Sequence, residues 1–92
     1  GLPMIEGMRA GVPICVADRP YAREICQDAA LYFDPRQPAD VANSLGRVLD
    51  DSELRECLIR RGKERVVQLD LLGGYAKLMS TLMEAAIRGR CA

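Results

Sequence analysis

The chain has 92 residues, with thirteen Lys plus Arg, thirteen Asp plus Glu and no histidine. A formal net charge of zero leaves no basic excess for binding nucleic-acid phosphates, so we expect no nucleic-acid partner. Without histidine, these residues cannot form Ser-His-Asp or Cys-His catalytic sites or a metal site that needs imidazole. The contents of 49% apolar and 28% charged residues are typical of a globular protein, and the length allows at most one compact unit.

The four cysteines, Cys15, Cys26, Cys57 and Cys91, lack the paired C-x-x-C spacing of zinc sites. The first three lie in apolar stretches, so we interpret them as small buried hydrophobic residues of a cytoplasmic protein. No apolar run approaches the length of about 20 residues that crosses a bilayer. The opening residues resemble neither an initiator segment nor a signal peptide, which favours sequence from within a domain.

The first third of the chain predicts a β-α-β unit. A short helix is expected up to Gly11, because Pro3 suits a first helical turn and Gly11 suits the left-handed position after the last turn. The apolar runs 12–17 and 29–33 predict strands, with a helix starting at Pro20 between them. Because this connection is just over a dozen residues long and carries a helix, the two strands should be parallel.

The remainder of the chain has helical periodicity and predicts three helices. Pro38 opens the first, Asp50-Asp51-Ser52 separates it from the second, and Gly73-Gly74 weakens the start of the third. On the first helix we expect one apolar stripe, formed by Val41, Leu45, Val48 and Leu49. On the second we expect an inward apolar face of Leu54, Leu58, Val66 and Leu69. The cations of the second helix should be mostly solvated: Arg55, Arg60, Arg61, Lys63 and Arg65. The third carries Tyr75, Leu78, Met79, Leu82 and Met83, which we interpret as core or docking surface.

Two strands with two apolar faces do not form an independent sheet. We therefore interpret the chain as α/β and as the distal half of a larger Rossmann-like parallel-sheet domain, with two short strands and about five helices. Residues 1–68 would form the distal part of that domain, and residues 69–92 a carboxyl-terminal helix.

Two places could carry chemistry. Gly1, Leu2 and Pro3 lead into a helix with Glu6 in its first turns. A helix amino terminus offers free N–H groups to a phosphate, and a carboxylate one turn along can accept hydrogen bonds from ribose hydroxyls. The same residues could simply start a helix, and spacing alone favours that alternative.

The second place is Asp18-Arg19, at the carboxyl end of the first predicted strand. In open α/β sheets this edge faces the ligand crevice. The simpler alternative, which the spacing again favours, is that Asp18 caps the helix that Pro20 opens.

Read in order, three segments resemble the family 4 retaining glycosyltransferases. Residues 1–18 are similar to the family's G-L-P-x-x-E-A-M-A-x-G-x-P-V-V-A-S segment, and residues 23–35 to its P-E-V-x-G-D-A-A-L-Y-F-D-P segment. Residues 41–65 are similar to its paired helices. The sequence departs from the family pattern at three places: Asp18 replaces a small polar residue, Gln27 stands where glycine is typical, and Leu69-Asp70-Leu71 replaces an F-S-W segment.

The resemblance implies an incomplete carboxyl-terminal domain of the GT-B architecture, in which two Rossmann-like domains face a cleft. Glu6 matches the second of two signature glutamates, which binds the ribose of the nucleotide-sugar donor. Gly1 and Leu2 match the loop whose backbone amides approach the donor's diphosphate and sugar. The first signature glutamate would fall before Gly1, and the resemblance assigns no catalytic residue here.

By the same resemblance, the parent enzyme would transfer a hexose from a UDP-, GDP- or ADP-sugar to a glycan or lipid-linked acceptor, with retention and without a cofactor or bound metal. The fragment alone is expected to be inactive, residues 69–92 to dock toward an amino-terminal domain, and peripheral membrane association of the parent stays open. The alternatives are a non-catalytic helical interaction module derived from such a domain and, less well matched, a sugar-nucleotide epimerase.

Overall fold

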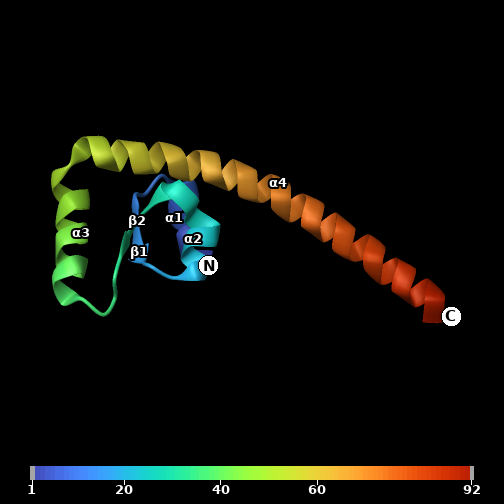
Figure 1. Cartoon of the computed structure of the whole chain (residues 1–92). Coiled ribbons are helices and arrows are strands. Elements are labelled where there is room, and N and C mark those ends of the chain that lie inside the picture. The colour runs from blue at the N-terminus through green and yellow to red at the C-terminus, as the bar shows by residue number, and fades with distance from the viewer. Residues whose placement is uncertain (1, 92) are drawn as a thin grey trace.

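The computed structural model describes the backbone of residues 2–91 and the side chains of residues 3–73. The elements follow in the order α1 (Leu2–Ala10), β1 (Ile14–Ala17), α2 (Pro20–Cys26), a short 3-10 turn η1 (Gln27–Ala29), β2 (Ala30–Phe33), α3 (Pro38–Asp50) and α4 (Ser52–Cys91). This mixed arrangement confirms the predicted α/β class and is consistent with part of a Rossmann-like domain (Figure 1).

The two strands are parallel, with Ile14 opposite Ala30 and Ala17 opposite Phe33. Helix α2 and the turn η1 connect them, which confirms the predicted β-α-β unit. In Figure 1, α3 lies on one side of the strands, α1 and α2 lie on the other, and α4 crosses one end of this assembly. The sheet is therefore covered on both faces, as the apolar sequences of its strands require.

Helix α1 ends in the left-handed turn that the sequence predicts. Gly11 has φ +77°, and the N–H groups of Gly11 and Val12 donate to the carbonyls of Met8 and Gly7 at 3.2 and 2.9 Å. This pair of bonds satisfies two of the last carbonyls of the helix. The turn reverses the chain, so the amino-terminal end of α1 comes to the carboxyl ends of the strands (Figure 1).

The core lies between α1, α2, η1, α4 and one face of the sheet. Its buried members are Met8, Ile14, Cys26, Ala29, Ala30 and Val66, and Met4 and Ile5 pack against them. The predicted burial of Cys26 is confirmed, whereas Cys15 and Cys57 are only partly buried, and the thiols of all three are free. On α4, burial of Leu58 and Val66 confirms the expected inward face.

The predicted second and third helices are one continuous helix of 40 residues. The expected separate start near Gly73-Gly74 is therefore wrong. Each glycine costs a helix only about 1 kcal/mol and, unlike proline, removes no backbone hydrogen bond. The side chains predicted to line the last helix lie outside the described residues: Tyr75, Leu78, Met79, Leu82 and Met83.

Two arginines of α4 bind the ends of other helices instead of facing solvent, so the expectation of mostly solvated cations is wrong for them. The buried Arg65 donates from Nε and a terminal nitrogen to the carbonyls of Ile25 and Glu24, at 2.6 and 2.9 Å. One terminal nitrogen of Arg55 donates to the carbonyls of Val48 and Leu49, at 2.9 and 2.5 Å. A cation at a helix carboxyl terminus satisfies free carbonyls and opposes the negative end of the dipole.

The apolar stripe expected on α3 is only partly covered. Val41 and Val48 are partly buried, whereas Leu45 and Leu49 are 48% and 74% exposed, so only part of the expected stripe packs against the rest of the fold. Among the described residues, no helix combines the length and apolarity needed to cross a membrane.

Candidate functional site

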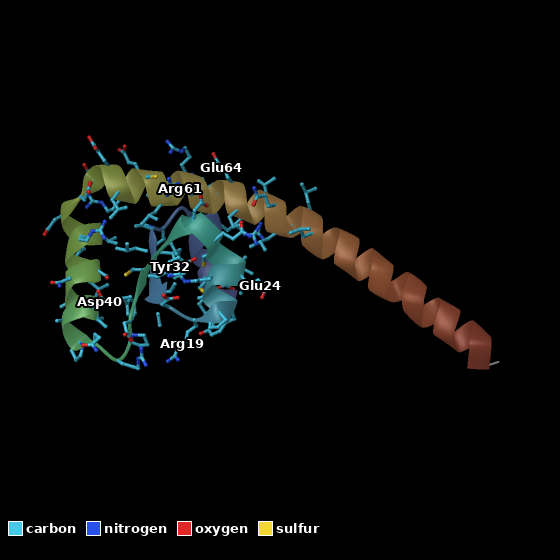
Figure 2. All side chains as sticks on the ribbon, in the orientation of Figure 1. Arg19, Glu24, Tyr32, Asp40, Arg61 and Glu64 are labelled. Atoms are coloured by element: carbon cyan, nitrogen blue, oxygen red, sulfur yellow. The ribbon has the colours of Figure 1, made fainter. Side chains whose placement is uncertain are left out.

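The first turn of α1 and the carboxyl ends of both strands surround a hollow of about 360 Å³. Pro3 and Met4 line it from α1, Val16 and Ala17 from β1, and Phe33 from β2. Arg19, just after β1, lies at this edge in Figure 2, whereas Arg61 and Glu64 of α4 lie at the opposite edge. The helix amino terminus and the strand ends, predicted separately as sites, are thus brought together at the edge where α/β sheets bind ligands.

Glu6 is exposed, while its neighbours Met4, Ile5 and Met8 pack into the core. Leu2 is the first residue of α1, and Gly1 lies outside the described residues. With a rise of about 1.5 Å per residue, Glu6 lies about 6 Å along the helix axis from Leu2. This spacing allows one ligand to meet both the free N–H groups of the first turn and a carboxylate.

Asp18 forms a bidentate ion pair with Arg23 instead of capping a helix. Its two carboxylate oxygens accept hydrogen bonds from Nε and a terminal nitrogen of Arg23, at 2.5 and 2.7 Å. These bonds hold the pKa of the Asp18 carboxyl below its ordinary value. The residue at the cap position of α2 is Arg19, with no side-chain cap bond, so the alternative that Asp18 caps this helix is wrong.

Arg23 connects Asp18 to the second strand. Its guanidinium lies over the ring of Tyr32, 4.3 Å from the ring centre, and the Tyr32 hydroxyl donates to the carbonyl of Gln27 at 2.5 Å. Gln27 has φ +50°, in the region that favours glycine. This backbone conformation gives a physical reason for the glycine that the resembling family has at this position.

Beside Asp18 lies a second hollow of about 330 Å³, lined by Asp18, Arg19, Asp34, Pro35 and Arg36. Hydrogen bonds from the side chain and backbone of Arg36 lower the pKa of Asp34, and the charge of Arg19 acts in the same direction. Sequence reasoning did not identify Asp34 and Arg36 as site residues. The available signal was an Asp-Pro turn directly after a predicted strand, since strand ends meet at one edge.

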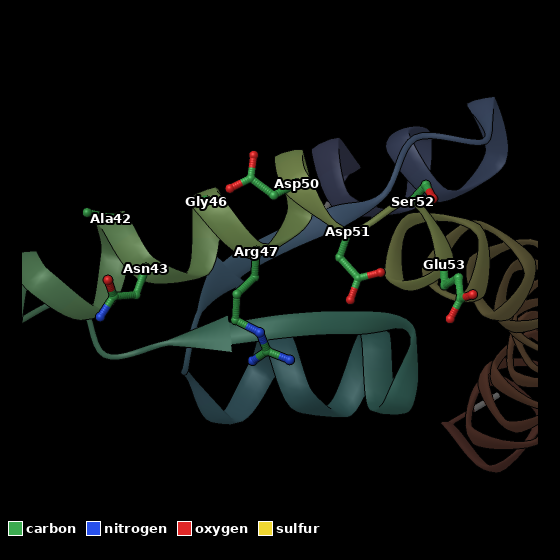
Figure 3. A pocket seen from close by; sticks show the side chains of 8 residues that line it. All are labelled: Ala42, Asn43, Gly46, Arg47, Asp50, Asp51, Ser52 and Glu53. Atoms are coloured by element: carbon green, nitrogen blue, oxygen red, sulfur yellow. The ribbon is translucent and has the colours of Figure 1, made fainter.

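A larger hollow, about 870 Å³, lies elsewhere (Figure 3). It is a shallow, open depression between the second half of α3 and the start of α4, with Arg47, Asp50 and Glu53 among its lining residues. It includes neither the strand ends nor the start of α1, so we do not assign the site there. Within the part of the chain that the structure describes, no three His, Cys, Asp or Glu side chains form a group that could hold a metal ion.

Comparisons with known proteins identify the family of the chain. The family model "Glycosyl transferases group 1" matches residues 1–65. Three proteins of Escherichia coli, each named serotype-specific mannosyltransferase WbdA, are similar over 45 residues, one at 40% identity and two at 38%. The similar segment covers 49% of this chain but only 5–6% of those relatives. No solved structure gives a significant match. The chain belongs to the group 1 glycosyltransferases.

Proposed function

We propose that this chain is part of the donor-binding domain of a retaining glycosyltransferase that moves a hexose from a UDP-, GDP- or ADP-sugar to a glycan or lipid-linked acceptor. The observation that carries the proposal is the start of α1 at the carboxyl edge of the strands, with Glu6 exposed one turn along. The names of the similar proteins make mannose the first sugar to test.

In this proposal the backbone amides of Gly1 and Leu2 bind the donor's diphosphate, and the Glu6 carboxylate accepts hydrogen bonds from the ribose hydroxyls. The helix dipole adds a charge of roughly +0.5 at this end of α1. When the bond between the anomeric carbon and the diphosphate breaks, this positive end stabilises the departing diphosphate, and no bound metal is needed.

Residues 1–68 form the donor-binding part in this proposal, and residues 69–92 dock toward an amino-terminal acceptor domain. In Figure 1 the carboxyl-terminal part of α4 extends away from the strands, which supports such a role. The isolated fragment is expected to be inactive because an acceptor site is needed for transfer. We further propose a cytoplasmic enzyme that can associate peripherally with a membrane.

The test is hexose transfer by the full-length protein with UDP-, GDP- and ADP-sugars. Glu6→Ala should raise the donor KM about tenfold or more, as expected for losing hydrogen bonds to a charged group. Glu64→Ala changes another exposed glutamate, which lies at the opposite edge (Figure 2); it is the matched control and should leave the donor KM unchanged. An inverted anomeric configuration in the product, or activity abolished by a metal chelator, would contradict retention or metal independence respectively.

The alternative is a non-catalytic interaction module. The exposure of large apolar side chains on two helices favours it, since Leu49, Leu71 and Leu72 are 74%, 72% and 57% exposed. The same experiment distinguishes the two functions: a full-length protein that binds none of the nucleotides and transfers no sugar would be an interaction protein.

A further inference from the structure

Helix α1 lies against α4 through a close contact at a glycine. A Cβ added to Gly62 of α4 would lie only 3.3 Å from the Cβ of Met8, and the Met8 side chain is 1% exposed. At the end of α1, Cε of Lys63 lies 3.3 Å from the position that a Cβ of Gly11 would take. The last turn of α1 and the middle of α4 therefore pack together closely.

An ion pair joins the same two helices further along α4. The two terminal nitrogens of Arg9, in the last turn of α1, donate to the two carboxylate oxygens of Asp70 at 3.1 and 2.9 Å. These bonds hold the pKa of the Asp70 carboxyl below its ordinary value. Both side chains are 56% exposed, so the pair adds little to the stability of the fold. Its two parallel hydrogen bonds do, however, fix the orientation of the groups that they join.

Asp70 stands where α4 leaves the rest of the fold. Leu69 still packs against the core, whereas Leu71 and Leu72 are 72% and 57% exposed, and a Cβ at Gly73 would meet nothing within 4 Å. Among the side chains of residues 3–73, Asp70 makes the last hydrogen bond from α4 to another element. Beyond this point α4 extends away from the strands (Figure 1).

We infer that Arg9 and Asp70 are positioning residues of the transfer reaction, because their ion pair fixes the direction in which α4 leaves the fold relative to α1. The inference rests on the proposed function, in which the start of α1 holds the donor and the distal part of α4 docks toward the acceptor domain. Arg9 lies about 10 Å along the helix axis from Leu2, at a rise of about 1.5 Å per residue. The pair therefore acts through the orientation of the two helices and not by contact with the donor.

The test measures hexose transfer by the full-length protein and its Arg9→Gln and Asp70→Asn variants. Without the pair, α4 leaves the fold in more orientations, and fewer of them align donor and acceptor. The kcat should therefore fall by up to about fivefold, the most that an exposed ion pair usually accounts for. The donor KM and the nucleotide affinity, which depend on the other end of α1, should be unchanged. High salt screens an exposed pair, so it should lower the kcat of the unmodified protein toward that of the variants.

Two further variants serve as controls. Arg61→Gln breaks another exposed pair of α4, in which Nε of Arg61 lies 3.7 Å from the carboxylate of Asp28. Buried residues of α4 hold the helix on both sides of that pair, so kcat should not change. Exchanging the charges, with Arg9→Asp and Asp70→Arg in one protein, should restore most of the lost kcat, since the same two groups meet again.

Amide hydrogen exchange of the same proteins tests the pair without any substrate. The amides of α4 around Asp70 should exchange faster in each single variant than in the unmodified protein or the charge-exchanged one. An unchanged kcat in both single variants, a loss of activity explained by a higher donor KM, or no restoration by the charge exchange would overturn the inference. A full-length protein that binds no nucleotide and transfers no sugar would refute the proposed function, and the exchange rates would still decide whether the pair holds α4 to α1.

Discussion

Replacing Gln27 with glycine should stabilise the fold. Gln27 has φ +50° and ψ −117°, a conformation that glycine adopts without strain. A non-glycine residue in such a sparsely populated region costs on the order of 1–3 kcal/mol. Glycine also raises the conformational entropy of the unfolded chain, and this lowers the gain by roughly 0.5–1 kcal/mol. The net gain for Gln27→Gly is therefore about 1 kcal/mol, within a range of about 0–2.5 kcal/mol.

The local contacts of Gln27 survive the substitution because they are made by its backbone. Its N–H donates to the Arg23 carbonyl, and its carbonyl accepts the Tyr32 hydroxyl. Thermal unfolding of the full-length protein and of the variant, followed by circular dichroism, measures the effect as a rise in the unfolding temperature.

A matched control separates this strain from the general effect of glycine. Gln37 is also exposed and also flanks a helix, but its φ is −116°, where glutamine is unstrained. Gln37→Gly should therefore lower the unfolding temperature. If Gln27→Gly lowered it as well, the strain argument at Gln27 would be refuted.

Three further predictions concern packing, capping and pH. Arg65→Met should lower the free energy of unfolding by about 3 kcal/mol, measured by urea unfolding, because two carbonyls of α2 lose their donor. Gly46→Ala should raise the free energy of unfolding by about 1 kcal/mol, because a Cβ at this position meets nothing within 4 Å. Gly62→Val should lower the free energy of unfolding, because a Cβ at this position lies 3.2 Å from the buried Met8. The same change in stability for both variants would contradict this packing. Arg23 lowers the pKa of the Asp18 carboxyl in the folded state. The ion pair therefore contributes its full stability at pH values above the pKa of this carboxyl in the unfolded chain, about 3.9. That contribution is lost as the pH falls through the lower pKa of the folded state. Asp18→Asn should make unfolding temperatures less dependent on pH below about 4, and an unchanged pH profile would contradict the ion pair's role.

The β-α-β unit could be predicted because its signals are local. Two short apolar runs, a connection that carries a helix and Gly11 at a helix end were enough to define parallel strands. The same topology places the start of α1 and Asp18 at one edge, because the carboxyl ends of parallel strands coincide. The general position of the candidate site was thus available from the sequence.

The contacts made by charged side chains could not be predicted. Arg65 finds its acceptors forty and forty-one positions away, at Ile25 and Glu24, and nothing in the periodicity of α4 distinguishes it from the solvated Arg60. Asp18 had a plausible local role as a helix cap, but Arg23 offers its carboxylate two charge-assisted hydrogen bonds. Such choices depend on geometry that only the fold provides.

The continuity of α4 could not be predicted either, for an energetic reason. Gly73-Gly74 lowers helix propensity by about 2 kcal/mol in total. Whether so small a penalty ends a helix depends on the stability of the turns on either side, and here the helix continues to Cys91.

The central claim is that Glu6 binds the ribose of a nucleotide whose diphosphate lies at the start of α1. The most direct measurement is titration calorimetry on the full-length protein and its Glu6→Ala variant, each with a nucleoside diphosphate and the 2′,3′-dideoxy analogue. Removing the hydroxyls should weaken binding about tenfold in the unmodified protein and leave the variant almost unaffected, because both changes remove one interaction. Equal losses in the two proteins would show that Glu6 does not contact the ribose.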